Sequence, residues 1–534
     1  MKRKDRVRNA LLATLALLAA AGVAACSTEW PEFRQNIFRT GSQFNNGPLA
    51  DPQKVQSLAV KWTFPGSAGV NLNPAPGPFY AAPIVFKDTV YIGNSNGFFY
   101  AIDATTGALK WQFPAKGSQP LTSTFTCNPS SMGIASSADV AVIGDTAAVV
   151  FGAPDMSIGT GLGSGRLFAL NAATGAVVWK SPEIARLRSD GVTHEQIGYS
   201  APTVYGQDVY VGIADHCDDP IQQGKLVAVH QSDGTIDTAF SFMSTGPPYG
   251  GGIWGTPAAW IGALIVTTGN VNEGQPEPSP DHALSMVELN SISGSVIWAW
   301  QPVPYDLDFD PDWTSTPSVM TASCGTFAVS TQKDGWTWAV NVGNGTPGPP
   351  SVQWAFPTGS WFPGGFHSGD GTSHNDTRYL RPGAVWDDVY IVQTGGLDVT
   401  TDVYDGFKHL YALNACASDP NRIRWIANVP NSSGGEGSIG PPSVTFGIVY
   451  VGTDLGHLVI FADPSIAAPD GYQCSDPDVS TLPCVPFGFT LVPEPHVVND
   501  INLGAGEIST EPVLADNRVY VSTGNGNVIM LAPP

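Results

Sequence analysis

A strand-and-turn pattern that recurs along most of the chain constrains its fold more than any other feature. In Ala82–Phe113, alternating apolar runs are separated by Lys-Asp, by Asn-Ser-Asn-Gly and by Ala-Thr-Thr-Gly, a pattern typical of strands joined by tight turns. Seven related units begin near Ser164, Ser200, Gly255, Ser315, Arg381, Pro441 and Thr510. Eight units spaced by roughly 40 to 70 residues predict an all-β fold, an eight-bladed β-propeller of four-stranded antiparallel blades.

A ring of blades has to close, because open first and last blades expose long hydrogen-bonding edges. We expect "SLAVKWTFP", Ser57–Pro65, to pair with the last unit and to close the ring. The propeller is therefore predicted to span residues 57–534, with an insertion at about 468–505. Residues 26–56 are expected to form an N-terminal wrap or linker on the outside of the ring.

The N-terminus has the features of an export signal. A basic start, "MKRKDRVR", precedes an apolar run and then small residues, which together predict a signal peptide over residues 1–25. The stretch "VAAC" resembles the lipobox of bacterial lipoproteins, which implies cleavage before Cys26 and lipidation of that cysteine. The chain is then expected to be exported and lipid-anchored to the cell envelope, on the periplasmic side or the cell surface. An ordinary signal peptide beside a structural cysteine is the alternative.

Six cysteines follow Cys26: Cys127, Cys217, Cys324, Cys416, Cys474 and Cys484. An even count in an exported chain favours disulfides. We predict that Cys474 and Cys484 close a local loop, and the pairing of the other four stays open. The chain contains no Cys-x-x-Cys pair, which argues against a zinc ribbon, a thioredoxin-like site and a covalently attached c-type haem.

The charge balance excludes one class of partner. The formal net charge is −22, and charged residues make up only 13% of the chain. Because the sequence after the signal contains no basic stretch that would neutralise phosphates, nucleic acid is not expected as a partner.

The ends of the repeat units point to a family. "AIDATTGALKW" and "ALNAATGAVVW" resemble the repeat of pyrroloquinoline-quinone (PQQ) proteins. In that repeat, the glycine takes a turn conformation that most residues avoid, and the tryptophan docks onto the neighbouring blade. The resemblance covers most of the mature chain. It implies the propeller but not the chemistry, because non-catalytic scaffold proteins share the repeat.

Local matches go further, towards the quinoprotein alcohol dehydrogenases. "GGGIWGTPAAWIGALIVTTGN" resembles the family segment in which a tryptophan forms the floor under PQQ and an asparagine ligates Ca²⁺. The resemblance places these roles on Trp254 and Asn270. A core aromatic residue and a turn asparagine are the structural alternatives.

Two more stretches resemble segments of that family that carry a catalytic residue and a cofactor-binding residue. "VPYDLDFD" resembles the stretch with the catalytic aspartate, for which Asp308 is the best match and Asp310 and Asp306 are rivals; Asp308 would also lie at the metal. "STQKDGWTWAVN" resembles the strand whose lysine contacts the quinone oxygens, which implies Lys333. A solvated loop, a calcium site unrelated to a quinone and an ordinary hairpin turn are the alternatives.

The family's calcium glutamate has no counterpart in "VYVGIADHCDDP". Asp215 or Asp218 are the candidate metal ligands there, while the strictly aligned position is nearer Cys217. The adjacent-cysteine ring found in many relatives is also absent, since Cys127 stands alone.

The resemblance implies a PQQ- and Ca²⁺-dependent oxidation of an alcohol or polyol, with electrons passing to a separate acceptor. The competing hypothesis is a non-catalytic propeller that binds partners at the cell envelope, and an enzyme with another cofactor is a third. Convergence of the site residues at one funnel separates the first hypothesis from the second.

Overall fold

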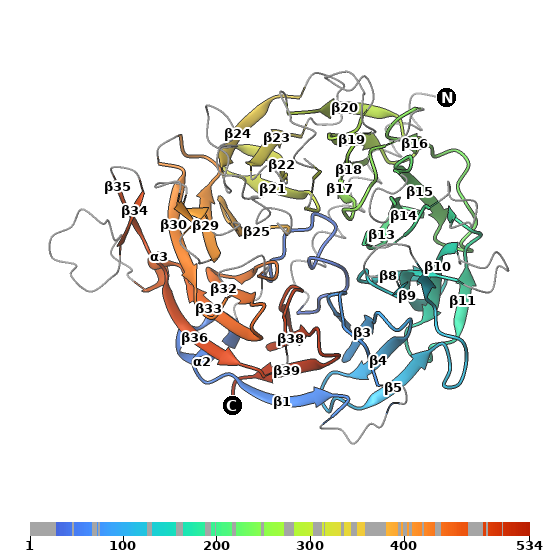
Figure 1. Ribbon diagram of the computed structural model, residues 1–534, viewed down its shortest axis with the longest axis horizontal. Helices are drawn as coiled ribbons and strands as arrows, with labels where there is room; N and C mark the ends of the chain where they lie inside the picture. Colours follow the sequence, from blue (N-terminus) through green and yellow to red (C-terminus); the bar gives the residue numbers. More distant parts are fainter. Residues whose placement is uncertain are drawn as a thin grey trace.

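The computed structural model shows a ring of blades around a central axis (Figure 1). It describes residues 28–44, 47–66, 72, 75–124, 131–155, 164–186, 194–197, 199–215, 221–246, 250–271, 282–302, 312–313, 315–332, 336–342, 350–357, 381–393, 397–398, 403–404, 408–418, 421–432, 439–467, 484–487, 490–504 and 506–534. Within these ranges, no helix has the length and apolar character needed to cross a membrane.

Eight antiparallel sheets form the blades, which confirms the predicted fold. Blades 1 to 4, each from its innermost to its outermost strand, comprise β2 (Ile84–Phe86), β3 (Thr89–Gly93), β4 (Phe99–Asp103) and β5 (Leu109–Phe113); β8 (Asp139–Ile143), β9 (Thr146–Pro154), β10 (Ser164–Asn171) and β11 (Val177–Lys180); β13 (Thr203–Tyr205), β14 (Asp208–Ile213), β15 (Lys225–His230) and β16 (Phe242–Met243); and β17 (Ala258–Trp260), β18 (Ala263–Thr267), β19 (Met286–Asn290) and β20 (Val296–Trp300).

Blades 5 to 8 follow the same order around the ring (Figure 1). They comprise β21 (Ser318–Ala322), β22 (Gly325–Thr331), β23 (Trp336–Asn341) and β24 (Val352–Pro357); β25 (Ala384–Trp386), β26 (Val389–Gln393), β29 (Lys408–Asn414) and β30 (Ile423–Val429); β31 (Ser443–Thr445), β32 (Ile448–Gly452), β33 (His457–Ala462) and β36 (His496–Asn502); and β37 (Val513–Ala515), β38 (Arg518–Ser522), β39 (Val528–Ala532) and β1 (Ala59–Phe64).

Short elements decorate the ring. They are β12 (Ala185–Arg186), which pairs with β10; the two-stranded pairs β6 (Ser123–Thr124) with β7 (Ser131–Met132), β27 (Leu397–Asp398) with β28 (Val403–Tyr404) and β34 (Cys484–Phe487) with β35 (Thr490–Pro493); and the helical turns η1 (Pro48–Ala50), α2 (Pro52–Val55) and α3 (Pro464–Ala467). The insertion expected at 468–505 is shorter at its end, because β36 is the outermost strand of blade 7.

The predicted turns form for local reasons. Lys87 and Asp88, between β2 and β3, both have positive φ, as a two-residue turn that matches the twist of its strands requires. In the Ala-Thr-Thr-Gly turn after β4, Asp103 Oδ1 accepts hydrogen bonds from the N–H groups of Thr105 and Thr106. The polar side chain thereby satisfies backbone donors that the turn leaves open.

The ring closes as the sequence predicts. β1, from the N-terminal part of the chain, pairs antiparallel with β39 at the C-terminus, from Ala59 opposite Ala532 to Phe64 opposite Val528. It is the outermost strand of blade 8. β1 therefore covers the edge of β39 that an open ring would leave exposed.

Tryptophans join successive blades, as the repeat implies. The indole N–H of an outermost strand donates to a carbonyl of the next blade, from Trp62 to Ala104 (3.1 Å), from Trp111 to Ala172 (3.1 Å) and from Trp179 to Gln231 (2.9 Å). Gly107 (φ +72°) lies directly under the Trp62 ring, where a Cβ would come within 2.8 Å of it. The turn glycine is thus required both for its conformation and for close approach.

The N-terminal segment, residues 28–44, lies at the centre of the ring, and the expectation that it wraps the outside is wrong for these residues (Figure 1). Its backbone bonds to innermost strands around the ring. The pairs are Trp30 with Val85, Ile37 with Ala259, Phe38 with Val319, Thr40 with Val385, and Gly41 and Gln43 with Val444. Residues from Leu49 to Val55 do lie outside, against Tyr450 and Asn499. The sequence of this short polar segment resembles that of a linker, because the residues it contacts are distant along the chain.

Two buried arginines pin this central segment. Arg34 forms an ion pair with Glu511 (2.6 Å) and donates to the carbonyls of Gly383 (2.6 Å) and Pro442 (2.9 Å). Arg39 pairs with Glu32 at 2.7 Å. Both guanidinium groups are fully buried, so these charges depend on their partners for stabilisation.

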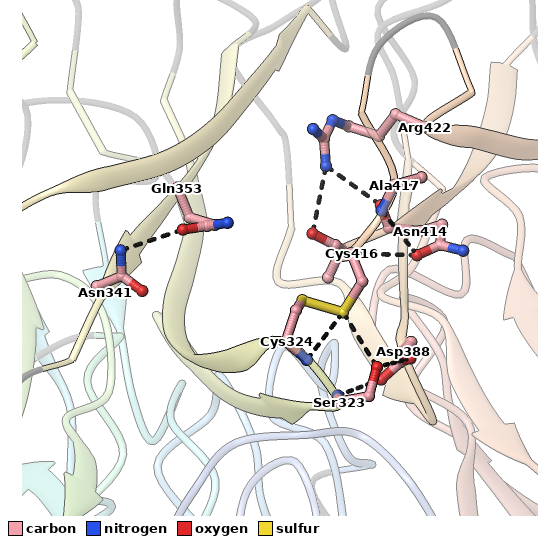
Figure 2. The surroundings of a disulfide bond; sticks show 10 residues. Ser323, Cys324, Asn341, Gln353, Asp388, Asn414, Cys416, Ala417 and Arg422 are labelled. Carbon is pink, nitrogen blue, oxygen red and sulfur yellow. Dashed lines mark hydrogen bonds between the residues drawn. A yellow bond between two sulfur atoms is a disulfide. The ribbon is translucent and has the colours of Figure 1, made fainter.

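A disulfide joins Cys324 and Cys416, two cysteines whose pairing the sequence left open (Figure 2). It connects the turn between β21 and β22 of blade 5 to the turn after β29 of blade 6. Ser323 hydrogen-bonds to Asp388 beside it. Cys474 lies outside the described residues, so its pairing with Cys484 stays a prediction.

Removing this disulfide is expected to loosen blades 5 and 6. The double substitution Cys324→Ser, Cys416→Ser should lower the free energy of unfolding by about 2–4 kcal/mol, because the bond closes a long loop in the unfolded chain. Its partners are 92 residues apart. The midpoint of urea unfolding measures the change, with Ser323→Ala as the local control. Equal midpoints for the double variant and the parent chain would contradict the expectation.

Glu288 is a buried acid in an apolar interface. It is fully buried in β19, opposite Ile265 and Trp298, on the face that packs against blade 5. The equivalent residue opposite the docking tryptophan is alanine in four other blades, at Ala101, Ala169, Ala339 and Ala412. Burial raises the pKa of Glu288 to about 7, against a smaller lowering by the Trp298 indole.

Ionisation of Glu288 is therefore expected to destabilise the folded protein as the pH rises. Because the folded pKa lies above the ordinary value of 4.5, the contribution of the protonated acid is complete below about pH 4.5 and is lost through about pH 7. Glu288→Gln should raise the free energy of unfolding at pH 8 by about 3 kcal/mol, with a much smaller gain at pH 5. Melting temperatures across this range test it, and a pH-independent difference between the two proteins would refute it.

Candidate functional site

Trp254 and Asn270 lie together at one end of blade 4. Trp254 precedes the innermost strand β17, and Asn270 follows the second strand β18. Because these strands are antiparallel, both residues lie at the end opposite the turn at Ile261 and Gly262. Both are half-buried. We call this end of the ring the site end.

The backbone holds the two segments side by side. The N–H of Gly251 donates to the carbonyl of Asn270 (2.6 Å), and the N–H of Gly269 donates to that of Gly252 (2.8 Å). A Cβ on Gly250 would lie 2.6 Å from the backbone carbonyl oxygen of Asn270. The run of three glycines therefore allows a close approach that larger residues would prevent.

Asp312 completes the described part of the site, and the sequence analysis did not single it out. It is buried, and its Oδ1 and the Trp254 Nε1 lie 2.8 and 3.0 Å from the position that a Cβ on Gly269 would occupy. Asp312 is the last residue of the acidic stretch "DLDFDPD". The high number of acids in that stretch is the sequence signal for this part of the site. The spacing of the acids does not tell that Asp312 lies close to Gly269.

The segments that carry the other predicted site residues start next to Asp312. Trp313 forms an isolated β-bridge with Gln332, which places the residue after the acidic stretch beside the "STQKDG" stretch. Asp306, Asp308, Asp310 and Lys333 themselves lie outside the described residues. Their proposed roles stay predictions.

Asp215 lies one blade away and is bound into its own loop. It is 1% exposed, its Oδ2 accepts the N–H of Gln222 (2.8 Å), and its carbonyl accepts the Gln196 side-chain amide (3.0 Å). These bonds give Asp215 a structural role in shaping the loop after β14. Asp218 lies outside the described residues.

Tyr199 is a second aromatic residue at this end that the sequence analysis missed. Its ring centroid lies 5.9 Å from that of Trp254, with the planes inclined by 37°. Tyr199 is 44% exposed. The two rings, from blades 3 and 4, offer a flat apolar ligand an aromatic surface wider than one indole.

The residues present fit a planar cofactor with a hard cation. A half-buried indole suits the face of a flat ring. The side-chain oxygens of Asn270 and Asp312, a carboxamide and a carboxylate, are of the kind that Ca²⁺ and similar hard cations bind. Gly269 lets the indole and the carboxylate come close together, since a Cβ there would meet both Asp312 and Trp254.

Comparison with known proteins decides the family. A family model for the β-propeller domain of glucose, ethanol and alcohol dehydrogenases, known as PQQ, matches residues 30–366. The chain belongs to this PQQ β-propeller family.

Among its PQQ relatives is the quinoprotein alcohol dehydrogenase PedH of Pseudomonas putida. It is 24% identical over 353 residues, which are 58% of this chain and 54% of PedH. The match thus spans about half the length of that enzyme.

Solved structures of alcohol and methanol dehydrogenases share the fold. The quinohemoprotein alcohol dehydrogenase of Comamonas testosteroni superposes with a TM-score of 0.61 at 16% identity, over 94% of this chain and 80% of the other. A europium-containing methanol dehydrogenase superposes with a TM-score of 0.60 at 14% identity, over 95% and 99%. At these identities, the likeness establishes the propeller rather than the reaction.

Proposed function

We propose that the protein is an exported PQQ-dependent dehydrogenase that oxidises an alcohol or a polyol and passes electrons to a separate acceptor. The observation that carries the proposal is the meeting of Trp254, Asn270 and Asp312 at one end of a PQQ-family propeller. Lipidation at Cys26 would hold the enzyme at the cell envelope. A non-catalytic scaffold has no need for an indole and two oxygen-bearing side chains around bare glycines.

Each residue has a role in this reaction. Trp254, with Tyr199 beside it, supports the flat face of the cofactor. Asn270 and Asp312 offer oxygens to a cation, either Ca²⁺ or a lanthanide such as the europium of the methanol dehydrogenase relative. Lys333 would contact the quinone oxygens, and one of Asp308, Asp310 and Asp306 would take the hydroxyl proton of the substrate. Bound PQQ supplies the two-electron oxidation.

A titration of the delipidated protein with PQQ tests this proposal. Quenching of tryptophan fluorescence is followed without metal, with Ca²⁺ and with La³⁺, and retained PQQ is measured by absorbance after gel filtration. We expect metal-dependent, saturable binding that is lost in Trp254→Ala and in Asn270→Ala. Trp111→Phe, which changes a tryptophan of blade 1, is the control for altered emission and should still bind.

Two results would contradict the proposal. No binding at micromolar PQQ with either metal would leave the propeller without its cofactor and favour the scaffold alternative. Binding that survives both substitutions would place the cofactor elsewhere. Once binding is shown, oxidation of alcohols and polyols with an artificial acceptor identifies the substrate class.

A further inference from the structure

The end of the ring opposite the site end carries the turns between first and second strands, and we call it the turn face. In blade 4 this turn is Ile261–Gly262, between β17 and β18. The N–H of Ser291 donates to the Gly262 carbonyl (3.0 Å), which brings the next turn of the blade, at Ile292, to the same face. The five residues of β18 separate the turn face from Asn270 by about 17 Å.

The chain enters the ring at the turn face. The carbonyl of Thr28 accepts the N–H of Asp516 (2.8 Å), in the turn between β37 and β38. The Oε1 of Glu29 accepts the N–H of Lys87 (2.8 Å), in the turn between β2 and β3. In the sequence, one residue separates Cys26 from Thr28, the first described residue at this face.

Large apolar side chains are exposed on the turn face. Ile292 is 75% exposed, Ile261 52%, Phe44 49% and Phe446 43%. Phe44 runs beside Phe446, because Ser42 forms a parallel bridge with Val444. Apolar side chains that reach the headgroup region add to the weak hold of a single lipid anchor, which by itself binds membranes only marginally.

We propose that the turn face rests on a lipid bilayer, with the site end directed away from it. The proposal depends on lipidation of Cys26, as proposed above, and not on the bound cofactor. Aspartates at the turns, including Asp88, Asp145 and Asp387, are exposed on this face. Because they repel anionic headgroups, the surface suits a zwitterionic bilayer. The anchor is therefore an orienting device: it leaves the candidate site open to soluble substrate and acceptor.

Labelling of single added cysteines on vesicles tests this orientation. Full-length lipidated protein carrying Ile292→Cys, on the turn face, or Ser118→Cys, in the exposed loop after β5 at the site end, is bound to phosphatidylcholine vesicles. It is then exposed to a polyethylene glycol maleimide. The parent chain, treated in parallel, corrects for the natural cysteines, and the same proteins in detergent give the reference rates.

On vesicles, labelling at position 292 should slow at least about tenfold relative to detergent, because a bilayer-covered surface excludes a large polar reagent. Labelling at position 118 should be unchanged. Equal rates at the two positions, or protection of position 118 alone, would overturn the proposal. So would failure of the protein to float with vesicles, or flotation that persists in Cys26→Ser. PQQ binding, measured on the detergent sample, reports separately on the proposed enzyme function.

Discussion

Glu511→Ala is expected to lower the free energy of unfolding by about 3–5 kcal/mol, because it leaves the buried guanidinium of Arg34 without its counterion. Glu511 is 1% exposed. Its Oε2 lies 2.6 Å from Arg34 Nη1, and its Oε1 accepts the Arg34 N–H (3.0 Å). The remaining acceptors of the guanidinium are backbone carbonyls, at Gly383 and Pro442. Loss of the carboxylate should therefore loosen the central segment from three blades at once.

The midpoint of thermal unfolding measures this change. Lys110→Ala, which removes an ion pair with Asp103 (3.4 Å, both side chains about one-third exposed), is the matched control and should cost less than about 1 kcal/mol. Glu511→Gln keeps the shape but not the charge, and it should fall between the two. If Glu511→Ala destabilises no more than Lys110→Ala, the buried pair does not hold the central segment in place.

Gly269→Ala is expected to reduce the affinity for PQQ at least about tenfold while the ring stays folded, because overpacking by one methyl group costs about 1–3 kcal/mol. The new Cβ would lie 2.8 Å from Asp312 Oδ1, 3.0 Å from Trp254 Nε1 and 3.2 Å from the Gly252 carbonyl. The aspartate and the indole therefore have to move, and these are the groups assigned to the cation and to the cofactor.

Gly66→Ala is the control, since a Cβ there meets nothing within 4 Å. The metal-dependent fluorescence titration gives the affinity, and the melting temperature shows whether the fold survives. Unchanged affinity in a folded Gly269→Ala protein would show that the space above Gly269 is not part of the cofactor site. A parallel loss in the control would point to a general defect instead.

Part of the site was readable from local sequence. Trp254 and Asn270 flank one predicted strand pair, and an antiparallel hairpin brings its two ends together whatever the rest of the fold does. The proximity of Asp312 to Gly269, by contrast, depends on how two blades pack against each other. The acidic stretch has four aspartates within seven residues, and only the packing of the chain in three dimensions shows that Asp312 lies close to the glycine.

The number of blades, their turns and the closing strand follow from periodicity, because alternation, turn residues and docking tryptophans are local properties repeated along the chain. The path of residues 28–44 through the centre, the Arg34–Glu511 pair and the Cys324–Cys416 bond are different. Arg34 and Glu511 are 477 residues apart in the sequence, and Cys324 and Cys416 are 92 residues apart. No short-range sequence pattern encodes contacts over such separations. Those contacts exist only once the ring has closed, because closure is what creates a buried axis for the segment to occupy.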